Sequence, residues 1–399
     1  MFNNKIALNP YKQLDSPSNA EIPPAWRYFT LRLRMKKIST ALVTGGLLLA
    51  IFSLGRIFEL RAGLYTPQLR FTDGLALGTH QLIHGSSPGA SNGLMRWSDF
   101  AYVQYVTNVD YLCNSVMILE ALHRTGTKAD LLMMYPEEWH LPELGGGDAK
   151  TESGSKDNHP TVPTESRLLA QARDLYKAKL APITVQTFTR GDPTWQQSYT
   201  KLLAFNQTQY KRVISLDSDA TVRQHMDELF FIPSSPIAMP RAYWLDEPTL
   251  SSQLVVLEPS QLEWQRIQAF MTTHEDSGFD MDILNTIYKD SSTVLPHRKY
   301  DLLTAEFRRH DHSKYLGSEE PWNATAALQE AKYVHFSDWP VPKPWLQASK
   351  VMEGYQPDCK DGGGAAGQNC TERDLWYGFY TDFSQRRQQI CNLTQTIAL

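Results

Sequence analysis

Hydrophobic positions along the chain alternate between short apolar runs and longer stretches with a helical period. Apolar runs typical of buried strands occupy residues 98–106, 129–134, 183–188 and 212–216. Between these runs, residues 115–123 and 165–180 place apolar side chains at the spacing of amphipathic helices. Strands separated by helices of about 10–16 residues form mostly parallel sheets with βαβ crossovers. The pattern therefore predicts an α/β domain, which we place at residues 98–350.

Two stretches depart from this pattern. Residues 144–163 are a polar, low-complexity segment, which is typical of an insertion at the protein surface. After about residue 350 the periodicity weakens, and we expect a Gly-rich, Cys-containing tail at residues 351–399.

The first 97 residues have a different organisation. Five cations and no acid lie between Trp26 and Lys37, and an uncharged run from Ile38 to Leu54 follows. As a helix this run is about 25 Å long, enough for a thin bilayer. The positive-inside rule then predicts a cytoplasmic tail at 1–37, a transmembrane signal-anchor at 38–55 and a luminal stem at 56–97. A buried core helix with a basic flank is the alternative.

Composition limits the function classes. The chain has 399 residues, 42% of them hydrophobic, and a formal net charge of −4. This charge argues against a dedicated nucleic-acid-binding protein, whose binding face would be strongly basic. Four cysteines without CxxC spacing argue against a structural zinc site.

Cysteines and glycosylation sequons agree with a luminal body. Cys359 and Cys370 flank a Gly-rich loop that a disulfide between them could close, and Cys391 follows, but the sequence does not decide which pair forms. Cys113 is expected to be a small hydrophobic residue within a buried helix. Asn-x-Ser/Thr sequons, all after the predicted anchor, occur at Asn206, Asn323, Asn369 and Asn392.

The segment with the most chemical information is Asp217-Ser218-Asp219, directly after the apolar run at 212–216. Open α/β sheets bind ligands at the carboxyl ends of their strands. Two carboxylates there suit Mg²⁺ or Mn²⁺ carrying a diphosphate. A turn with solvated acids is the simpler explanation of one such motif, and a second DxD begins a helix-like stretch at Asp280. We prefer the first motif because an apolar strand precedes it.

Two enzyme classes share a strand that ends in DxD. In a haloacid-dehalogenase-type phosphatase, Asp217 would be the nucleophile and Asp219 the general acid. In a nucleotide-sugar glycosyltransferase, both carboxylates would hold a metal ion that bridges the donor phosphates. The motif lies in mid-domain after several strands, which favours the transferase. A non-catalytic luminal glycan-binding protein remains a third alternative.

His335 and Lys343 extend this candidate site. His335 lies in the strand-like segment VHFSDW, where a neutral imidazole can be a third metal ligand. Lys343 begins the sequence KPW eight residues later, and its ammonium can neutralise a leaving diphosphate.

From about residue 100 to 345, these motifs resemble glycosyltransferase family 8, the glycogenin-like retaining enzymes, and especially its fungal N-acetylglucosaminyltransferase branch. Asp217, Asp219 and His335 match the family's metal ligands. Thr107, Asn108 and Tyr111 resemble its uridine-binding segment. Lys201, Ser218 and Lys343 correspond to donor-binding positions, and Asp280 corresponds to a residue on the sugar side.

The resemblance implies a nucleotide-diphospho-sugar transferase (GT-A, Rossmann-like) fold with a mostly parallel sheet behind one transmembrane helix. It also implies Mn²⁺ or Mg²⁺ as cofactor, a UDP-sugar donor, UDP-N-acetylglucosamine in particular, and a glycan acceptor. Such proteins are single-pass type II proteins of the Golgi membrane, so we expect membrane anchoring there.

Three departures from the family pattern fall on the sugar side. Met281 replaces a glutamine, Asp338 stands at the glycine of the HFxG segment, and Ser251-Ser252 replaces Asn-Ser. The metal and uridine subsites are left intact.

Asp280 and Lys343 are the catalytic candidates, Asp280 for sugar orientation or charge stabilisation. The lack of a strong nucleophile motif favours same-face attack. Tryptophans that either stack on sugars or pack in the core are Trp244, Trp339 and Trp345.

Overall fold

The computed structural model describes residues 95–141, 162–186, 197–273, 279–347, 349–361, 368–394 and 396–397. The predicted tail, signal-anchor and most of the stem lie outside these ranges, as does most of the polar insertion, and they stay predictions. Within the described ranges, no helix is long and apolar enough to cross a membrane.

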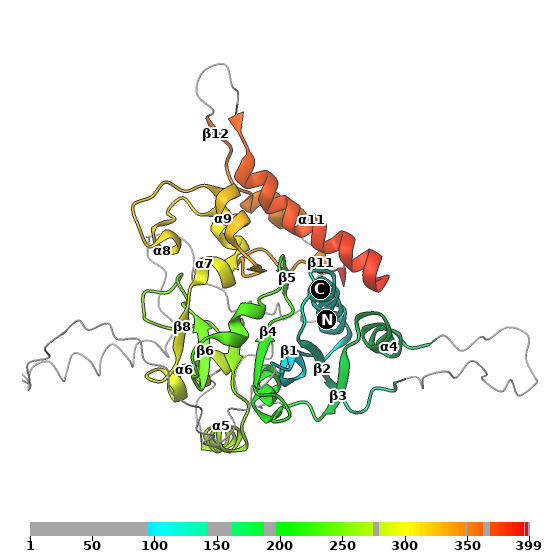
Figure 1. The fold of residues 1–399 in the computed structure, drawn as a ribbon. Coiled ribbons are helices and arrows are strands. Elements are labelled where there is room, and N and C mark those ends of the chain that lie inside the picture. The colour runs from blue at the N-terminus through cyan, green and yellow to red at the C-terminus, as the bar shows by residue number, and fades with distance from the viewer. Residues whose placement is uncertain are drawn as a thin grey trace, which may run out of the picture. The chain divides into compact units, whose positions relative to one another are not determined.

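A seven-stranded sheet forms the centre of the described domain, in the order β3-β2-β1-β4-β7-β6-β8 (Figure 1). Its strands are β1 (Phe100–Tyr105), β2 (Asp130–Pro136), β3 (Lys179–Ile183), β4 (Arg212–Leu216), β6 (Ile237–Pro240), β7 (Leu254–Leu257) and β8 (Thr293–Leu295). Strand β7 runs antiparallel to both of its neighbours, whereas the other pairs in this sheet are parallel. The predicted α/β class and mostly parallel sheet are therefore confirmed.

Hydrophobic side chains cover both faces of this sheet, because successive residues of a strand point to opposite sides. On β1, Tyr102 belongs to one core cluster, and its neighbours Ala101 and Val103 belong to the other. The first cluster holds apolar residues of α3 (Val109–Arg124), α4 (Thr164–Tyr176) and α11 (Thr371–Cys391). The second holds those of η3 (Ser198–Asn206), α5 (Gln261–Thr273) and α6 (Asp280–Tyr288). The result is a three-layer domain.

A small sheet in the order β5-β10-β9 adjoins the carboxyl end of β4. It consists of β5 (Ala220–Val222), β9 (Leu302–Leu303) and β10 (Tyr333–His335). Strand β5 begins directly after Asp219, and His335 pairs in register with Ala220. This pairing brings two segments that are more than a hundred residues apart in the sequence to one place.

Short elements complete the described chain. The helical ones are η1 (Trp97–Asp99), η4 (Asp227–Phe231), α7 (His297–Tyr300), η5 (Thr304–Arg308), α8 (Ser313–Leu316), α9 (Ala324–Glu330) and α10 (Ser349–Tyr355). The strands are β11 (Leu346–Gln347), which pairs with β14 (Thr396–Ile397), and β12 (Lys360–Asp361), which pairs with β13 (Gln368–Asn369).

The predicted bounds of two helices and one strand are wrong. Helix α3 begins at Val109, before the predicted 115–123, because the Asn108 side chain accepts a hydrogen bond from the Tyr111 amide and caps it. The helix predicted at 165–180 ends at Tyr176, where Lys177 adopts a left-handed conformation (φ 59°). The next strand, β3, consequently lies at 179–183 and not at 183–188.

The predicted loose tail is wrong in a more instructive way. Residues 371–391 form the helix α11, which runs over the domain beside α3 (Figure 1). Its buried aromatic residues repeat at helical spacing, and they are Trp376, Phe379, Tyr380 and Phe383. The Gly-rich segment before this helix obscured that periodicity.

Two disulfides fasten the C-terminal region. Cys359 is bonded to Cys370, which confirms that this pair can close the Gly-rich loop. Cys113 is bonded to Cys391, so the expectation of an unpaired hydrophobic cysteine is wrong. The packing of α11 on α3 is the physical reason, since it places these two residues side by side.

The Cys113–Cys391 bond should contribute more to stability than the other disulfide. It joins residues 278 positions apart, against 11 for Cys359–Cys370, and a longer loop loses more chain entropy when it is closed. Replacing Cys113 and Cys391 with serine should lower the free energy of unfolding by roughly 2–5 kcal/mol. Denaturant titration of this variant against the Cys359/Cys370 serine variant checks the order, and an equal or smaller loss would contradict it.

Candidate functional site

Asp217 and Asp219 lie where the central strand β4 leaves the large sheet and enters β5. Backbone contacts fix both residues. The Asp217 amide donates to the Gln253 carbonyl at 2.9 Å, and the Phe336 amide donates to the Asp219 carbonyl at 2.9 Å. The Tyr333 hydroxyl donates to the Asp217 carbonyl at 2.9 Å. The two carboxylates are therefore held on a rigid turn at the carboxyl edge of the sheet.

His335 meets both carboxylates, as the sequence predicts. Its Nε2 atom lies 3.1 Å from Asp219 Oδ1 and 3.9 Å from Asp217 Oδ2. Ligand atoms of the three residues all lie within 4.8 Å of one another. Two hard carboxylate oxygens and one imidazole nitrogen suit Mn²⁺ or Mg²⁺. This donor set therefore fits the divalent cation that the sequence predicts.

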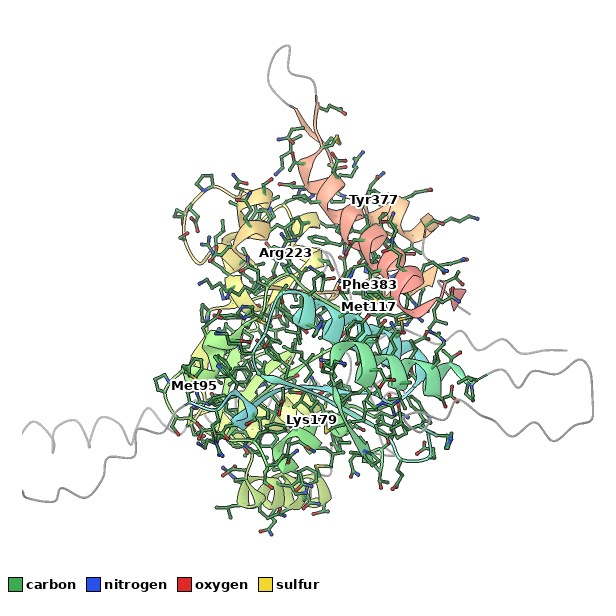
Figure 2. The ribbon with its side chains drawn as sticks, turned by 45° about the vertical axis from the view of Figure 1, so that its right-hand side comes forward. Met95, Met117, Lys179, Arg223, Tyr377 and Phe383 are labelled. Carbon is green, nitrogen blue, oxygen red and sulfur yellow. A yellow bond between two sulfur atoms is a disulfide. The ribbon has the colours of Figure 1, made fainter. Side chains whose placement is uncertain are left out.

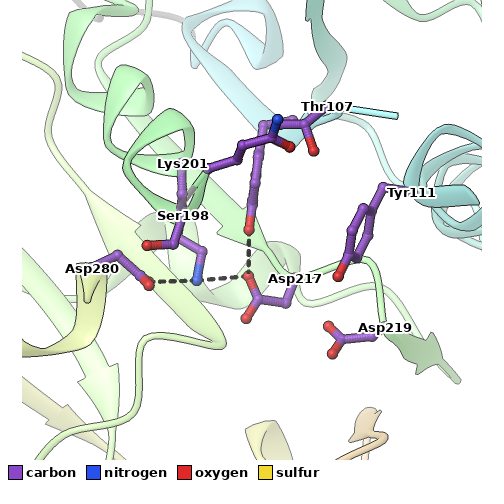
Figure 3. Close-up of a pocket in the computed structure, with 9 residues that line it drawn as sticks. Thr107, Tyr111, Ser198, Lys201, Asp217, Asp219 and Asp280 are labelled. Carbon is purple, nitrogen blue, oxygen red and sulfur yellow. Dashed lines mark hydrogen bonds and ion pairs between the residues drawn. The ribbon is translucent and has the colours of Figure 1, made fainter. Parts of the chain in front are cut away.

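Two lysines neutralise these carboxylates, Lys201 at Asp217 and Lys343 at Asp219. Lys343 Nζ lies 2.6 Å from Asp219 Oδ2 and donates to the Phe336 carbonyl at 2.7 Å. Lys201, which is only 4% exposed, lies between Asp217 and Asp280, as Figure 3 shows. Its Nζ is 2.6 Å from Asp217 Oδ1 and 2.8 Å from Asp280 Oδ2. It also donates to the Ser252 carbonyl at 2.9 Å.

The pKa values of Asp217 and Asp219 are shifted in opposite directions. Burial raises the pKa of Asp217 to about 6, although Lys201 opposes this shift. Burial also acts on Asp219, but His335 and Lys343 outweigh it and hold its pKa well below the usual value. Burial lowers the pKa of Lys201, but the charges of Asp217 and Asp280 outweigh this effect and raise it. Asp219 and Lys201 thus keep their charges, while Asp217 can exchange a proton near neutral pH.

The second DxD has a different role. Asp282 Oδ2 accepts a hydrogen bond from the Phe279 amide at 2.9 Å, and so it caps the start of α6. Asp280, the first residue of the helix, pairs with Lys201. The helix predicted after Asp280 is confirmed.

One pocket lies on the α3 side of the carboxylates (Figure 3). Its lining residues are Tyr105, Thr107, Tyr111, Gln197, Ser198, Lys201, Asp217, Asp219 and Asp280. Thr107 and Tyr111 were predicted to bind the donor, and both line this pocket. Asn108 and Ser218 were predicted as well, but they do not line it, because Asn108 caps α3 and Ser218 is buried. Sequence reasoning missed Tyr105, although its place at the end of β1 is a usable signal. Gln197 and Ser198 had no such signal.

A second pocket adjoins the same carboxylates. It is lined by Trp244, Ser252, Gln253, Phe279, Met281 and Ser337, together with Asp217, Asp219, Asp280 and His335. The two pockets share Asp217, Asp219 and Asp280. A ligand that extends from one pocket into the other would therefore pass over the candidate metal site.

The tryptophans separate into two groups. Trp244 lines the second pocket, where an indole ring can stack on a sugar. Trp345 is buried and packs edge-on against Tyr111 at a ring distance of 5.4 Å. Trp339 lies in the turn that follows β10 and lines neither of these pockets.

The sheet is mostly parallel and carries paired carboxylates at the end of its central strand, as the sequence predicts. No family model matches the chain. Glucose N-acetyltransferase 1 of Aspergillus fumigatus is 43% identical over 319 residues, covering 75% of this chain and 79% of that protein. The chain therefore belongs to the glucose N-acetyltransferase 1 family.

Other proteins are also similar to this chain. Glucose N-acetyltransferase 1 of Gibberella zeae is 52% identical over 301 residues, and the match covers 74% of this chain but only 63% of that protein's length. Glycogenin of Neurospora crassa is 21% identical over 241 residues, covering 55% and 31% of the two chains. These matches confirm the predicted glycogenin-like resemblance. Among solved structures, the apo glycosyltransferase GlyE of Streptococcus pneumoniae has a TM-score of 0.43 and 13% identity, covering 72% and 62%.

Metal binding should depend on pH through Asp217. Its pKa of about 6 lies above the ordinary value, so a proton competes with the ion below that pH, whereas Asp219 stays ionised. Mn²⁺ affinity of the free protein should rise by up to about tenfold per pH unit below this pKa and level off above it. Calorimetric titration with Mn²⁺ between about pH 5 and 8 checks this. Constant affinity across the range would contradict it.

Proposed function

We propose that this protein is a retaining glycosyltransferase that moves N-acetylglucosamine from UDP-N-acetylglucosamine to a glycan acceptor, with Mn²⁺ or Mg²⁺ at the DxD motif. The observation that carries the proposal is the meeting of two pockets at Asp217, Asp219 and Asp280, with His335 beside them. A nucleotide-sugar consists of a nucleoside and a sugar joined by a diphosphate. The two pockets can each hold one end, and the shared carboxylates lie where the diphosphate would be.

The nucleotide end fits the pocket beside α3. Tyr111 offers an aromatic ring for a base, and Thr107 and Ser198 offer hydroxyl groups. Asp217, Asp219 and His335 would hold the metal ion, which when bound would neutralise charge on the diphosphate. Lys201 keeps Asp217 and Asp280 in place through its two ion pairs.

Lys343 is suited to the departing diphosphate. Its ammonium lies at the Asp219 carboxylate, on the same edge of the site where the phosphates would lie. As the sugar leaves, negative charge grows on the β-phosphate oxygens, and a preorganised cation stabilises that charge. Lys343 would thus act on the leaving group as a point charge.

The sugar and the acceptor fit the second pocket. Trp244, Phe279 and Met281 give it an apolar wall, and Ser252 and Gln253 can bind hydroxyl groups. The carboxylates that line the two pockets are all paired with Lys201, Lys343 or His335. This pairing makes each carboxylate a poor nucleophile, which supports same-face attack by the acceptor. Asp280 would then orient the sugar and stabilise positive charge on it.

The donor is inferred from chemistry and from the relatives together. The relatives' name joins glucose with an N-acetyl group. A sugar that combines glucose with an N-acetyl group is N-acetylglucosamine. A site that binds a diphosphate would bind this sugar as its nucleoside-diphosphate derivative. The phosphatase alternative requires Asp217 to attack phosphorus, but Asp217 Oδ1 lies 2.6 Å from Lys201 Nζ and accepts from the Tyr105 hydroxyl at 3.5 Å.

Binding of UDP-sugars with Mn²⁺ to His335→Ala tests the proposal. Loss of a metal ligand should cost more than the roughly 10–100-fold that loss of a second-sphere partner costs. Asp219→Ala should behave in the same way, whereas Lys343→Ala should weaken diphosphate binding and slow transfer with metal affinity less affected. Thermal stabilisation by a panel of UDP-sugars and their slow hydrolysis are the readouts.

A buried histidine outside both pockets is the matched control. His312 is 7% exposed and bonds to Glu306 at 2.8 Å. His312→Ala should lose stability but keep Mn²⁺-dependent binding. Wild-type affinity in His335→Ala would refute the transferase site, and a covalent phosphoenzyme at Asp217 would establish the phosphatase instead.

A further inference from the structure

Asp338 is a buried carboxylate that three side chains bind. Its side chain is 1% exposed. Oδ1 accepts a hydrogen bond from Arg308 Nε at 2.6 Å. Oδ2 accepts from Trp376 Nε1 at 2.6 Å and from the Tyr380 hydroxyl at 2.8 Å. Placing a charge in the interior is costly unless it is paired and hydrogen-bonded, as this one is.

Its place in the chain connects it to the candidate site. Asp338 lies in residues 335–343, which we call the site loop, between the metal candidate His335 and the diphosphate candidate Lys343. The Asp338 carbonyl accepts from the Val341 amide at 2.7 Å, which closes a turn. Arg308 Nη2 also donates to the Trp339 carbonyl at 3.0 Å. The turn folds the loop back, so that Lys343 Nζ reaches both the Phe336 carbonyl and Asp219.

The side chains that hold Asp338 come largely from α11. Phe336 of the site loop packs edge-on against Tyr380 and Phe383, at ring distances of 5.4 and 5.0 Å. Figure 2 shows Phe383 on the part of α11 that lies near Met117 of α3. The far end of α11 is fixed to α3 by the Cys113–Cys391 disulfide. The C-terminal helix is thus a rigid support for the site loop.

We propose that Asp338 is a positioning residue, which fixes the site loop to Arg308 and α11 so that Lys343 reaches the diphosphate site. The consequence for turnover rests on the proposed function. The consequence for the Lys343 side chain does not, because the contact with Asp219 is present in the free protein. Glycine at this position, the family pattern, could not make these three hydrogen bonds.

A purely structural carboxylate provides the comparison. Asp227 is 5% exposed and also has three donors, and it lines neither pocket. It accepts from the Tyr102 hydroxyl at 2.9 Å, the Thr127 hydroxyl at 2.6 Å and the Lys128 amide at 3.0 Å. Asp227→Asn therefore reproduces the loss of a buried, triply bonded charge without touching the site loop.

The decisive experiment is a double-mutant cycle with Lys343. Asp338→Asn and Asp227→Asn are each made in the wild-type protein and in Lys343→Ala, and kcat/KM for UDP-N-acetylglucosamine hydrolysis with Mn²⁺ is measured. If Asp338 acts through Lys343, Asp338→Asn should lower kcat/KM by about tenfold in the wild type and less than about twofold without Lys343. Asp227→Asn should have the same effect in both backgrounds. An equal loss from Asp338→Asn in both would overturn the proposal.

A second measurement does not require turnover. Acetylation of Lys343 by a small amine-reactive reagent, followed by mass spectrometry, reports how firmly its ammonium is held in the free protein. Asp338→Asn should accelerate labelling of Lys343, and Asp227→Asn should not. Faster labelling in a protein that lacks UDP-sugar activity would reject the proposed function and support the positioning role. Unchanged labelling in Asp338→Asn would overturn the positioning role.

Discussion

The repulsion between Asp217 and Asp219 is the constraint on which the site depends. Two carboxylates on one turn at the edge of a sheet are stable in a largely buried place only if cations balance them. Lys201 from η3 and Lys343 from the site loop supply that balance, and His335 of β10 lies beside Asp219. Lys201 is far in sequence from the site loop, which holds both His335 and Lys343, so the site exists only when the large sheet, the small sheet and the site loop are all in place.

This dependence explains the arrangement of the surrounding fold. Pairing of β10 with β5 sets His335 beside the DxD turn. Packing of α11 on α3 joins the support of the site loop to the helix that carries Tyr111. The pocket beside α3 and the diphosphate candidate Lys343 therefore share one scaffold, although their residues are distant in sequence.

Much of this could be predicted from the sequence because the signals are local. The apolar run before Asp217 identified β4, and helical spacing identified α3 and α4. His335 and Lys343 were found through their motif. The distance of His335 from Asp219 comes from strand pairing and that of Lys343 from the turn of the site loop, and one sequence reveals neither. The prediction for Cys113 was wrong because its partner Cys391 lies on α11, a helix that was not recognised in the sequence after the Gly-rich segment. Asp338 looked like a lost glycine, since its partners Trp376 and Tyr380 belong to that same helix.

We propose that Asp217, Asp219 and His335 hold one divalent cation at the diphosphate of a bound nucleotide. Anomalous diffraction from crystals grown with Mn²⁺ and UDP tests it directly. We expect a manganese peak in contact with both carboxylates and with His335 Nε2, and the uridine in the pocket lined by Thr107 and Tyr111. Bound UDP with no manganese peak between these three side chains, or with the ion elsewhere, would contradict it.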